Sequence, residues 1–372
     1  MTEAATEARR GNILYRFAGL EDDGELKQLL RNNSMGGWVR LSLEREPSFF
    51  RGLDLMGESR VVIAQEESPS GRTVGMYTCA RLPVHLNGLP AKLLYLGGLR
   101  IEATFRHRLR LLKDGFDSLT VLAGQPMQMA FTSVAAGNQT ARRLLEANLP
   151  GMPRYQPLGD MITLALPAKK RPDRPNLQQA ALKDVPSLAA FFNQQARGFQ
   201  FGAHLEEAWL AGLNGKQGLR LEDFWLMKDG QDLHGCLAIW DQRDFKQTVV
   251  KGYHPSLSRF RLPYNCLAPL VGCPRLPAPG QELSNVFLAF VAFQDPTSEV
   301  AVSAIREGLA KVLEKGGEFG LLGLSANHPL LSRFRKPLRT WSYRTCIEAV
   351  HWPGNPLPSL DPLPVQPEIA LL

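Results

Sequence analysis

The sequence predicts an α/β protein built from two tandem domains of similar layout. The chain has 372 residues, more than one ordinary hydrophobic core accommodates. A charged, proline-rich stretch at 167–176, PAKKRPDRPN, is unsuited to helix or sheet and indicates a boundary near the middle. The element order before this stretch recurs after it. We therefore expect domains at 12–167 and 176–352, a linker at 168–175 and an extended Pro-rich tail at 353–372.

The first predicted domain contains helices and strands in the order helix, helix, three strands, helix, strand, helix, strand. Apolar residues recur at helical spacing in the helices, and Ser68-Pro69-Ser70-Gly71 is a hairpin signal between two of the strands. The expected helices are 24–32, 42–57, 105–119 and 139–147, and the expected strands are 59–65, 75–82, 93–101, 127–135 and 161–166.

The second predicted domain repeats much of this order. Its expected helices are 183–196, 298–315 and 329–334, and its expected strands are 224–227, 233–240, 285–293, 319–325 and 343–350. Asn138 and Asn327 occupy corresponding places in the two halves, directly after a strand and before a helix. Asparagine in that place is typical of a helix N-cap, so this detail supports a duplication.

Residues 93–119 form the most informative segment of the chain. An apolar strand runs into an arginine-rich turn, and the turn opens an amphipathic helix. Free amides at a helix N-terminus and nearby cations favour a bound anion such as a phosphate. Arg106, Arg110 and Lys113 share one helix face, which is equally typical of a solvent-exposed face without a ligand. Gly97-Gly98 predicts a β-bulge in the strand.

On these residues the chain resembles the GNAT superfamily of acyl-CoA-dependent N-acetyltransferases, in a tandem arrangement. The likeness covers Ile13 to Trp352 in element order and is closest at 99–112 and 138–145. It implies two GNAT-like domains, each with a mixed, mostly antiparallel central sheet flanked by helices. It also implies acetyl-CoA or another acyl-CoA as co-substrate, and no metal. The residues that it implies for cofactor binding are Leu99, Arg100, Ile101, Arg106, His107, Arg108, Leu109, Arg110, Leu111 and Asn138.

The chain departs from the family pattern at three places. Leu109 and Leu111 stand where the family turn has glycine and glycine or alanine, which allow close approach of a phosphate. Leu145 stands where a tyrosine usually protonates the leaving thiolate. The turn of the second half contains Asp295 and Glu299 and no arginine, so we expect that half to be cofactor-free.

Three residues are candidates for the chemistry. Acyl transfer to an amine needs a neutral amine, and therefore a group that takes its proton. Glu102 follows the cofactor strand, and Tyr77 and Tyr95 lie on strands beside the expected thioester. The alternatives are an exposed turn glutamate and two core aromatics. The resemblance also offers the tail residue Leu372 as an active-site carboxylate, but we expect the tail to lie on the surface.

Composition bounds the partners. The chain has 43 Lys+Arg and 36 Asp+Glu, a net charge of +7, with no interleaving of aromatic and basic residues typical of a nucleic-acid groove. Its five cysteines are scattered without a CxxC pair, which argues against disulfide scaffolds and zinc sites. No apolar run is long enough to span a membrane, and the N-terminus is polar. We expect a cytoplasmic protein without membrane or nucleic-acid partners.

The function expected from the sequence is an acyl-CoA-dependent N-acyltransferase that transfers acetyl to an amine of a small molecule or peptide. A first alternative is a catalytically degenerate, GNAT-like acyl-CoA-binding or regulatory protein, which Leu109, Leu111 and Leu145 favour. A second is an aminoacyl-tRNA-dependent transferase, which the basic charge would suit. A homodimer is left open.

Overall fold

The computed structural model describes residues 7–55, 57–68, 71–106, 108–123, 129–169, 177–215, 217–271, 275–335 and 340–372. Most of the expected linker and the turn residue His107 lie outside these ranges.

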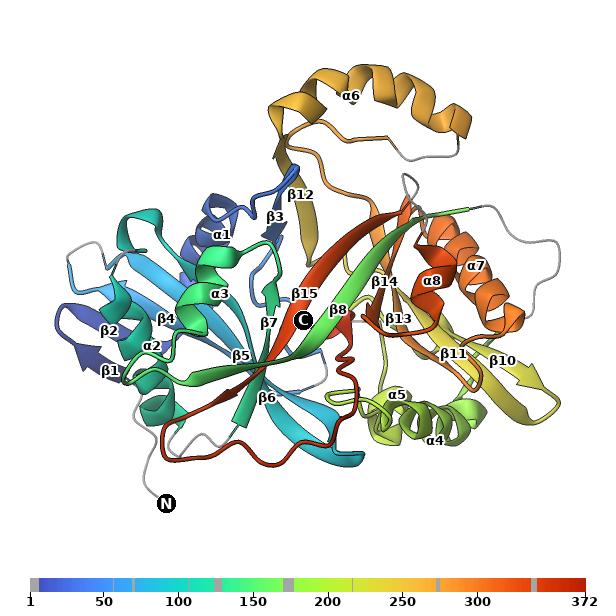
Figure 1. Ribbon diagram of the computed structural model, residues 1–372, viewed down its shortest axis with the longest axis horizontal. Coiled ribbons are helices and arrows are strands. Elements are labelled where there is room, and N and C mark those ends of the chain that lie inside the picture. The colour runs from blue at the N-terminus through green and yellow to red at the C-terminus, as the bar shows by residue number, and fades with distance from the viewer. Residues whose placement is uncertain are drawn as a thin grey trace.

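Thirteen strands of the described residues form one continuous sheet, and two more form a small separate one (Figure 1). The order across the large sheet is β1 (Glu7–Arg10), β2 (Ile13–Phe17), β4 (Ser59–Glu66), β5 (Thr73–Leu86), β6 (Leu89–Ile101), β7 (Met129–Ala135), β15 (Trp341–His351), β8 (Arg154–Pro167), β14 (Phe319–Ser325), β13 (Asn285–Phe293), β11 (Asp232–Trp240), β10 (Phe224–Asp229) and β9 (Leu177–Gln179). The small sheet pairs β3 (Val39–Glu44) with β12 (Gln247–Tyr253).

Helices cover both faces of the large sheet. They are α1 (Asp23–Asn32), α2 (Leu109–Ala123), α3 (Gln139–Leu145), α4 (Val185–Ala196), α5 (Glu207–Ala211), α6 (Pro255–Leu267), α7 (Glu299–Glu314) and α8 (Leu330–Phe334). The expected stripe of α2 is buried at Leu112, Phe116 and Leu119, whereas Leu109 is half-exposed. The helix therefore packs one apolar face on the sheet, as amphipathic helices do.

The two halves of the sheet exchange their last strands. β8, which closes the first half, pairs with β14 of the second half, and β15, which closes the second half, pairs with β7 of the first. β8 and β15 also pair with each other antiparallel, so they join the halves at the centre. Each half thus completes its sheet with the other's strand, as expected for a duplicated fold. The exchange crosses the expected domain boundary, and the division into two domains stays a prediction.

Three expectations about local structure are wrong. The expected helix at 42–57 begins instead with the end of β3, whose antiparallel pairing with β12 favours an extended chain. Asn327 does not cap α8, because Pro329 is its N-cap and the His328 ring accepts the amide of Leu330. β1, β2, β3, β9, β12, α5 and α6 were not expected.

The tail at 353–372 returns into the middle of the molecule instead of lying on the surface (Figure 1). Val365 is 2% exposed and Ala370 is fully buried. Apolar side chains of the tail pack against a buried cluster that joins β5, β6, β7 and β15. The backbone oxygen of Leu372 accepts a hydrogen bond from Lys246 Nζ at 2.6 Å. Alternation of prolines with apolar residues in the tail suits such an extended, buried path.

Candidate active site

The parallel strands β6 and β7 separate part of the way along their length. They pair over only three positions, Leu94 to Leu96 against Ala130 to Thr132. At the last of these, Thr132 Oγ1 donates to the carbonyl oxygen of Leu96 at 2.6 Å. Beyond it the strands part, and the backbone at this split becomes available to a third component.

A β-bulge lies in β6 directly beyond the last paired position. The register between β5 and β6 shifts between Met76 and Thr78, and Gly98 takes a left-handed φ of +63°. A Cβ at Gly98 would lie 3.2 Å from Thr78 Oγ1, so both conformation and space favour glycine there. The bulge predicted from Gly97-Gly98 is confirmed.

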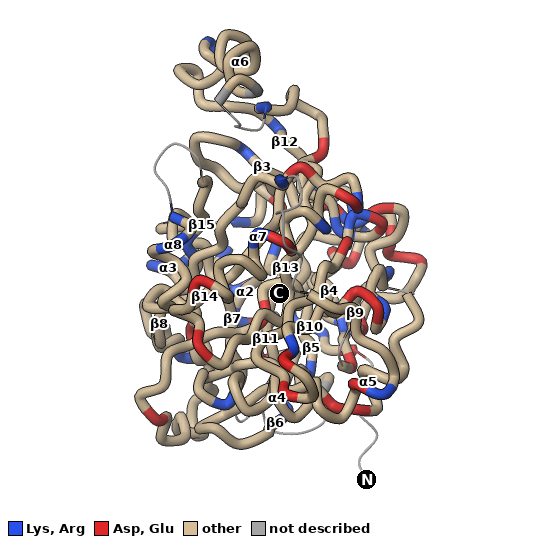
Figure 2. The backbone as a smooth tube through the Cα atoms, turned by 90° about the vertical axis from the view of Figure 1, so that its right-hand side faces the viewer, with Lys and Arg blue, Asp and Glu red and all other residues tan. Residues whose placement is uncertain are grey.

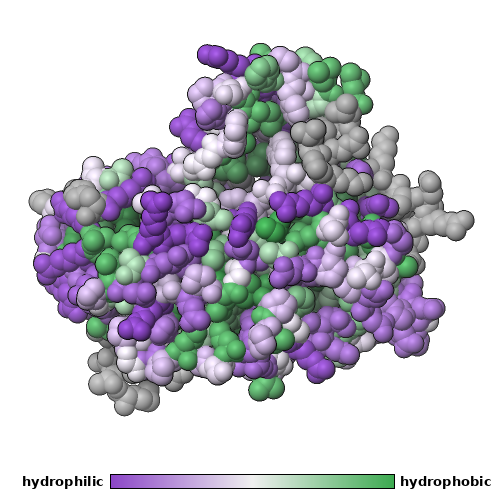
Figure 3. All heavy atoms as spheres, viewed as in Figure 1, coloured by the Kyte–Doolittle hydropathy of each residue, from purple (hydrophilic) through white to green (hydrophobic). Residues whose placement is uncertain are grey.

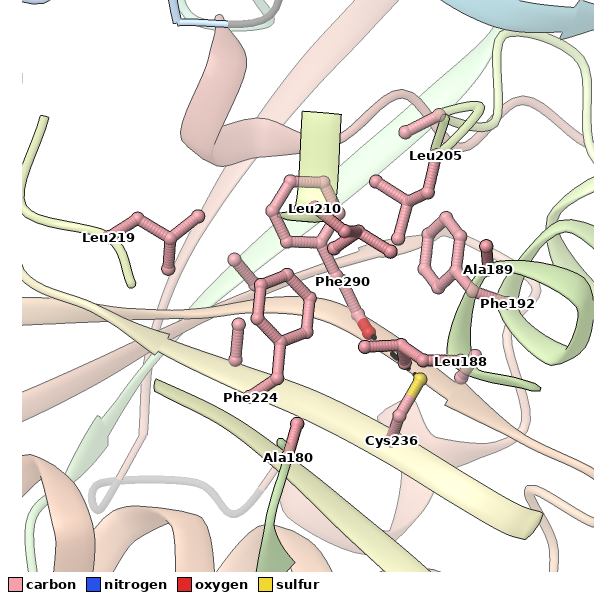
Figure 4. Close-up of a cluster of buried hydrophobic side chains, with 14 of the residues drawn as sticks. Ala180, Leu188, Ala189, Phe192, Leu205, Leu210, Leu219, Phe224, Cys236 and Phe290 are labelled. Carbon is pink, nitrogen blue, oxygen red and sulfur yellow. Dashed lines mark hydrogen bonds between the residues drawn. The ribbon is translucent and has the colours of Figure 1, made fainter. Parts of the chain in front are cut away.

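The second half repeats this geometry. β13 and β14 also pair in parallel at three positions, and the register between β11 and β13 shifts between Cys236 and Ala238. The left-handed residue of this bulge is Phe290, with φ +50°. Its ring is fully buried and stacks on Phe224 and Trp240, which holds an unfavourable backbone conformation in place (Figure 4).

The tail fills this second split with hydrogen-bonding side chains. Glu368 Oε2 accepts the amide of Phe290 at 2.7 Å, and Gln366 Oε1 accepts the amide of Ser325 on β14 at 2.9 Å. Burial raises the pKa of Glu368 to about 7, and the neighbouring Lys246 opposes that shift. Burial likewise lowers the pKa of Lys246 to about 7. In the second half, a side chain of the tail therefore accepts the hydrogen bond of the bulge amide.

A cavity of about 130 Å³ adjoins the filled split, lined by residues of α4, β13 and the tail. His328 contributes to its wall, and burial lowers the pKa of that imidazole to about 4. The ring of Phe199 stacks on His328 with centroids 6.1 Å apart. A neutral, stacked histidine suits an apolar wall better than a proton carrier.

A smaller cavity of about 30 Å³ lies between α2 and the strands β2, β4, β5 and β6. Met76, Leu99, Leu111 and Phe116 are among the side chains that line it, together with Arg100. The cavity is mostly apolar, and its volume suits about two water-sized groups.

The three candidate catalytic residues do not converge on one point. Tyr77 packs in the core under α2 and donates to the carbonyl oxygen of Gly115 at 3.0 Å. Tyr95 packs in the core on the other face of the sheet. Glu102 lies at the far end of β6, about 20 Å along the strand from Tyr95, and pairs with Arg72 at 3.2 Å. Burial raises the pKa of both tyrosines.

Of these three, Tyr95 lies nearest the split. Its hydroxyl is 2.8 Å from Ser133 Oγ on β7, so this hydrogen bond links the two parting strands. A Cβ at Gly97 would lie 2.6 Å from the Tyr95 ring, which explains why the first glycine of the pair is also needed. Tyr95 and Ser133 therefore mark one side of the split.

Arg100 is a half-buried cation beside the same split. Its Nη1 donates to the carbonyl oxygen of Leu99 at 2.9 Å, and its buried Nε has no hydrogen-bond partner among the described residues. Burial lowers its pKa, opposed by the hydroxyls of Tyr95 and Tyr343. None of the ion pairs among the described residues includes Arg100. Guanidinium N–H groups that have no acceptor in the protein are suited to bind a carbonyl or phosphate oxygen of a ligand.

The arginine-rich turn is wound tightly. Amides of Arg108 and Leu111 donate to carbonyl oxygens within the turn at 2.9 Å each. Arg106 reaches Asn33 Oδ1 at 2.6 Å, Arg108 stacks on Phe105, and Arg110 pairs with Asp114 at 3.4 Å. Leu111 is buried in the core. The turn therefore presents exposed cations rather than an open loop of amides.

Asn138 and Leu145 lie at the two ends of α3. Asn138 Oδ1 accepts the amide of Ala141 at 3.2 Å, so its predicted N-cap role is confirmed. Leu145 is buried against the apolar face of the sheet. The position at which the resemblance implies a tyrosine acid is therefore taken by a leucine that packs in the hydrophobic core.

Glu348 is a site residue that sequence reasoning missed. It lies on β15 and is fully buried, and neither carboxylate oxygen has a hydrogen-bond partner in the part of the chain that the structure describes. Burial raises its pKa to about 7, as does Glu146, whereas Arg142 opposes the shift. A lone glutamate within the apolar stretch CIEAV was the available signal.

The position of Glu348 connects it with the first split. It pairs across β15 and β7 with Thr132, which in turn pairs with Leu96 on β6. Directly paired residues point to the same face of a sheet, here the face covered by α2 and α3. Glu348 therefore stands in one row with the residues at which β6 and β7 separate.

Split parallel strands, a bulge at each split and exchanged closing strands define the tandem α/β architecture of this chain. A solved structure of Saccharomyces cerevisiae N-myristoyltransferase with bound myristoyl-CoA is 10% identical, with a TM-score of 0.60 over 96% of this chain and 88% of that one. A second structure of that enzyme gives 9% identity and a TM-score of 0.61 over 95% and 82%. A GCN5-related N-acetyltransferase from Anabaena variabilis is 12% identical at a TM-score of 0.45.

No protein-family model and no curated protein sequence matches the chain. The likeness to the solved structures confirms the predicted fold class, including its mixed sheet flanked by helices. Among the described residues, no helix is both long and apolar enough to cross a membrane.

Proposed function

We propose that the chain is an acyl-CoA-dependent N-acyltransferase whose co-substrate binds at the split between β6 and β7. The observation that carries this proposal is the contrast between the two bulges. Glu368 bonds the amide of Phe290 in the second half, which supports the corresponding Gly98 as the place where a ligand oxygen bonds in the first. The filled second split supports a cofactor-free second half.

The reaction needs four events at this split. The amine nitrogen attacks the thioester carbonyl carbon, the amine loses a proton, the C–S bond breaks, and the thiolate gains a proton. The Gly98 amide and the Arg100 guanidinium would stabilise the developing oxyanion. Tyr95, tied to Ser133, would position the thioester between the strands.

Glu348 is suited to the proton transfer that Leu145 cannot perform. A carboxyl with a pKa of about 7 exists in both protonation states at neutral pH, so its carboxylate form would take the proton of the attacking amine and the resulting carboxyl would give a proton to the leaving thiolate. Tyr77 and Glu102 stay weaker candidates, because a backbone carbonyl holds the first and Arg72 pairs with the second.

The small cavity between α2 and the sheet, which Leu99 and Arg100 of β6 help to line, supports acetyl as the transferred group. Its volume of about 30 Å³ suits a two-carbon group, whereas a fourteen-carbon chain would require the packing of α2 to open. The exposed Arg106, Arg108 and Arg110 would hold the phosphates of coenzyme A by charge rather than by close amide contacts. The acceptor is an amine of a small molecule or peptide.

The alternative function is an acyl-CoA-binding regulatory protein that has lost catalysis. The buried Leu111 and Leu145 favour it, because each replaces a family residue with core packing. Calorimetry with acetyl-CoA, followed by thiol release across a panel of amines, separates the two. Binding without turnover supports the regulatory protein, and absence of binding at millimolar acetyl-CoA contradicts both.

Two variants make this test specific. Arg100→Gln removes the guanidinium charge beside the split and is expected to weaken acetyl-CoA binding about tenfold. Arg81→Gln, an exposed arginine of β5, is the matched control and should leave binding unchanged. Equal affinities in both variants would place the cofactor away from the β6–β7 split.

A further inference from the structure

Helix α6 projects from the body of the molecule (Figure 1). It follows β12, and not one of its described side chains is buried. Its main attachments are reciprocal hydrogen bonds between the Asn265 side chain and the backbone of Leu276, at 2.9 and 2.7 Å. Arg261 adds a bond to the same carbonyl oxygen at 3.3 Å. These bonds hold one side of the helix to the segment around Leu276.

Large apolar side chains are exposed on this projection. Phe260 and Leu262 are each 67% exposed, Leu267 is 61% exposed and Leu270 is 81% exposed. Green hydrophobic atoms are visible at the top of the space-filling view (Figure 3). Burying side chains of this size is ordinarily favourable, so a cluster of them in water indicates a surface that another component covers.

The apolar residues face away from the attachment. Asn265 and Arg261 point to Leu276 in the segment that follows the helix, and successive helix residues turn by about 100°. Phe260, Pro263 and Leu267 therefore lie on the opposite side, at i, i+3 and i+7. The outer face of α6 is an apolar stripe.

Charge on this part of the chain has one sign. Residues 245–281 contain five Lys and Arg and no Asp or Glu. Lys246 is turned into the protein and Lys251 pairs with Glu44 at 2.6 Å. Arg259, Arg261 and Arg275 take part in none of the ion pairs found among the described residues. In Figure 2 the helix carries blue residues and no red ones.

An exposed tryptophan stands at the base of the projection. Trp38 is 68% exposed, and its ring centroid lies 4.9 Å from that of His254, the N-cap of α6. The backbone amide of His254 donates to the carbonyl oxygen of Trp38 at 2.8 Å. Tryptophan and arginine beside an apolar helix are typical of contacts with the polar–apolar boundary of a lipid bilayer.

We propose that α6 and Trp38 dock on the surface of an anionic lipid bilayer. The apolar stripe would enter the headgroup region, and the unpaired arginines would meet lipid phosphates and carboxylates. A second copy of this chain is a poorer occupant, because two such surfaces would bring uncompensated arginines together. This docking needs no membrane-spanning helix, and it departs from the expectation that the chain has no membrane partner. It is independent of the proposed acyl transfer.

Co-sedimentation of the full chain with vesicles tests the proposal. Phosphatidylcholine vesicles containing phosphatidylserine should bind the protein, and binding should fall as salt rises. Pure phosphatidylcholine should bind it far less. The double variant Arg259→Ala/Arg275→Ala should weaken binding about thirtyfold, from two surface cations. Phe260→Glu/Leu267→Glu should abolish it.

Matched controls keep the result interpretable. Leu89→Glu and Leu182→Glu alter side chains that are each 70% exposed elsewhere on the molecule, and should bind vesicles like the unaltered chain. Thermal unfolding of each variant checks that it folds. Equal binding to neutral and anionic vesicles, or none at low salt, would overturn the proposal. A stable dimer that dissociates in the Phe260→Glu/Leu267→Glu variant would also overturn it. The same holds if the chain binds acidic proteins but does not bind anionic vesicles.

Discussion

The split between β6 and β7 and the split between β13 and β14 each begin after three parallel pairs, and each contains one left-handed residue. In the first half that residue is Gly98, which leaves space beside the backbone. In the second half it is Phe290, whose ring is locked in the core and whose amide is bound by Glu368. The same backbone device thus contains a glycine in one half, where we propose that a ligand binds, and is bonded by the protein's own tail in the other.

This difference means that one bulge contributes to ligand binding and the other to folding stability. A bulge amide that bonds a ligand must remain accessible in the unliganded protein. A bulge amide that the tail uses contributes to the folded state, because an unsatisfied buried amide is costly. Substitutions of Phe290 and Glu368 at the second split should therefore change stability, and substitution of Arg100 at the first should change acetyl-CoA affinity.

The largest effect is expected at Phe290. Phe290→Gly relieves the left-handed strain, worth about 1 kcal/mol, but removes a fully buried ring worth about 3–5 kcal/mol. A net loss of about 3 kcal/mol in the free energy of unfolding should follow, measured by urea denaturation. A neutral or stabilising result would mean that strain, not packing, dominates this bulge.

Glu348 should make stability depend on pH. Its pKa is raised from 4.5 to about 7 in the folded state, so the folded chain holds this proton more tightly than the unfolded chain does. The stability from this group is complete below pH 4.5 and is lost as pH rises through 7. Glu348→Gln should remove up to about 3 kcal/mol of that decline.

Urea denaturation at pH 5 and pH 8 compares the two proteins directly. Glu307→Gln, on α7, is a control at another buried glutamate, and it should retain the decline. Parallel pH profiles for the unaltered chain and Glu348→Gln would show that Glu348 has an ordinary pKa.

Removing the carboxylate that fills the second split should cost about 2 kcal/mol. Glu368→Ala leaves the Phe290 amide without its acceptor and Lys246 without its neighbouring carboxyl. Glu314→Ala, an exposed residue at the end of α7, serves as the control in thermal and urea unfolding. If acetyl-CoA binds the Glu368→Ala variant at a second site, the tail blocks a cofactor site at the second split instead of only stabilising the fold.

The smallest effect is expected at the turn. Arg106 is exposed and already bonded to Asn33, so Arg106→Gln should weaken acetyl-CoA binding only about threefold. Arg333→Gln, an exposed arginine at the end of α8, is the matched control. Calorimetry at low and physiological salt would show the difference shrink as ions screen the charge. A loss above thirtyfold would mean that the turn, not the split, provides most of the affinity.

Sequence patterns predicted the elements whose signals are local. The apolar runs of β13 and β14, the stripe of α2 and the Gly97-Gly98 bulge are each readable within about fifteen residues. β3 and β12 were missed because they stabilise each other across about 200 residues of sequence. The exchange of β8 and β15 was equally invisible, since each strand alone fits either half.

The candidate site was readable only in part. Arg100 was expected from its place at a strand end, but its missing partner depends on how the surrounding elements pack. Glu348 reaches the first split only through the exchanged strand, so its role depends on topology rather than on spacing. Phe290 and Glu368 are 78 residues apart, and no local pattern joins them.

Hydrogen exchange in the presence of acetyl-CoA tests the comparison most directly. Exchange measured by mass spectrometry reports backbone amides at both splits in one experiment. We expect acetyl-CoA to slow exchange in peptides covering 93–106 and 132–141, at the first split. Exchange in peptides covering 285–297, at the second split, should not change. Protection at 285–297, or no protection in either half at saturating acetyl-CoA, would contradict it.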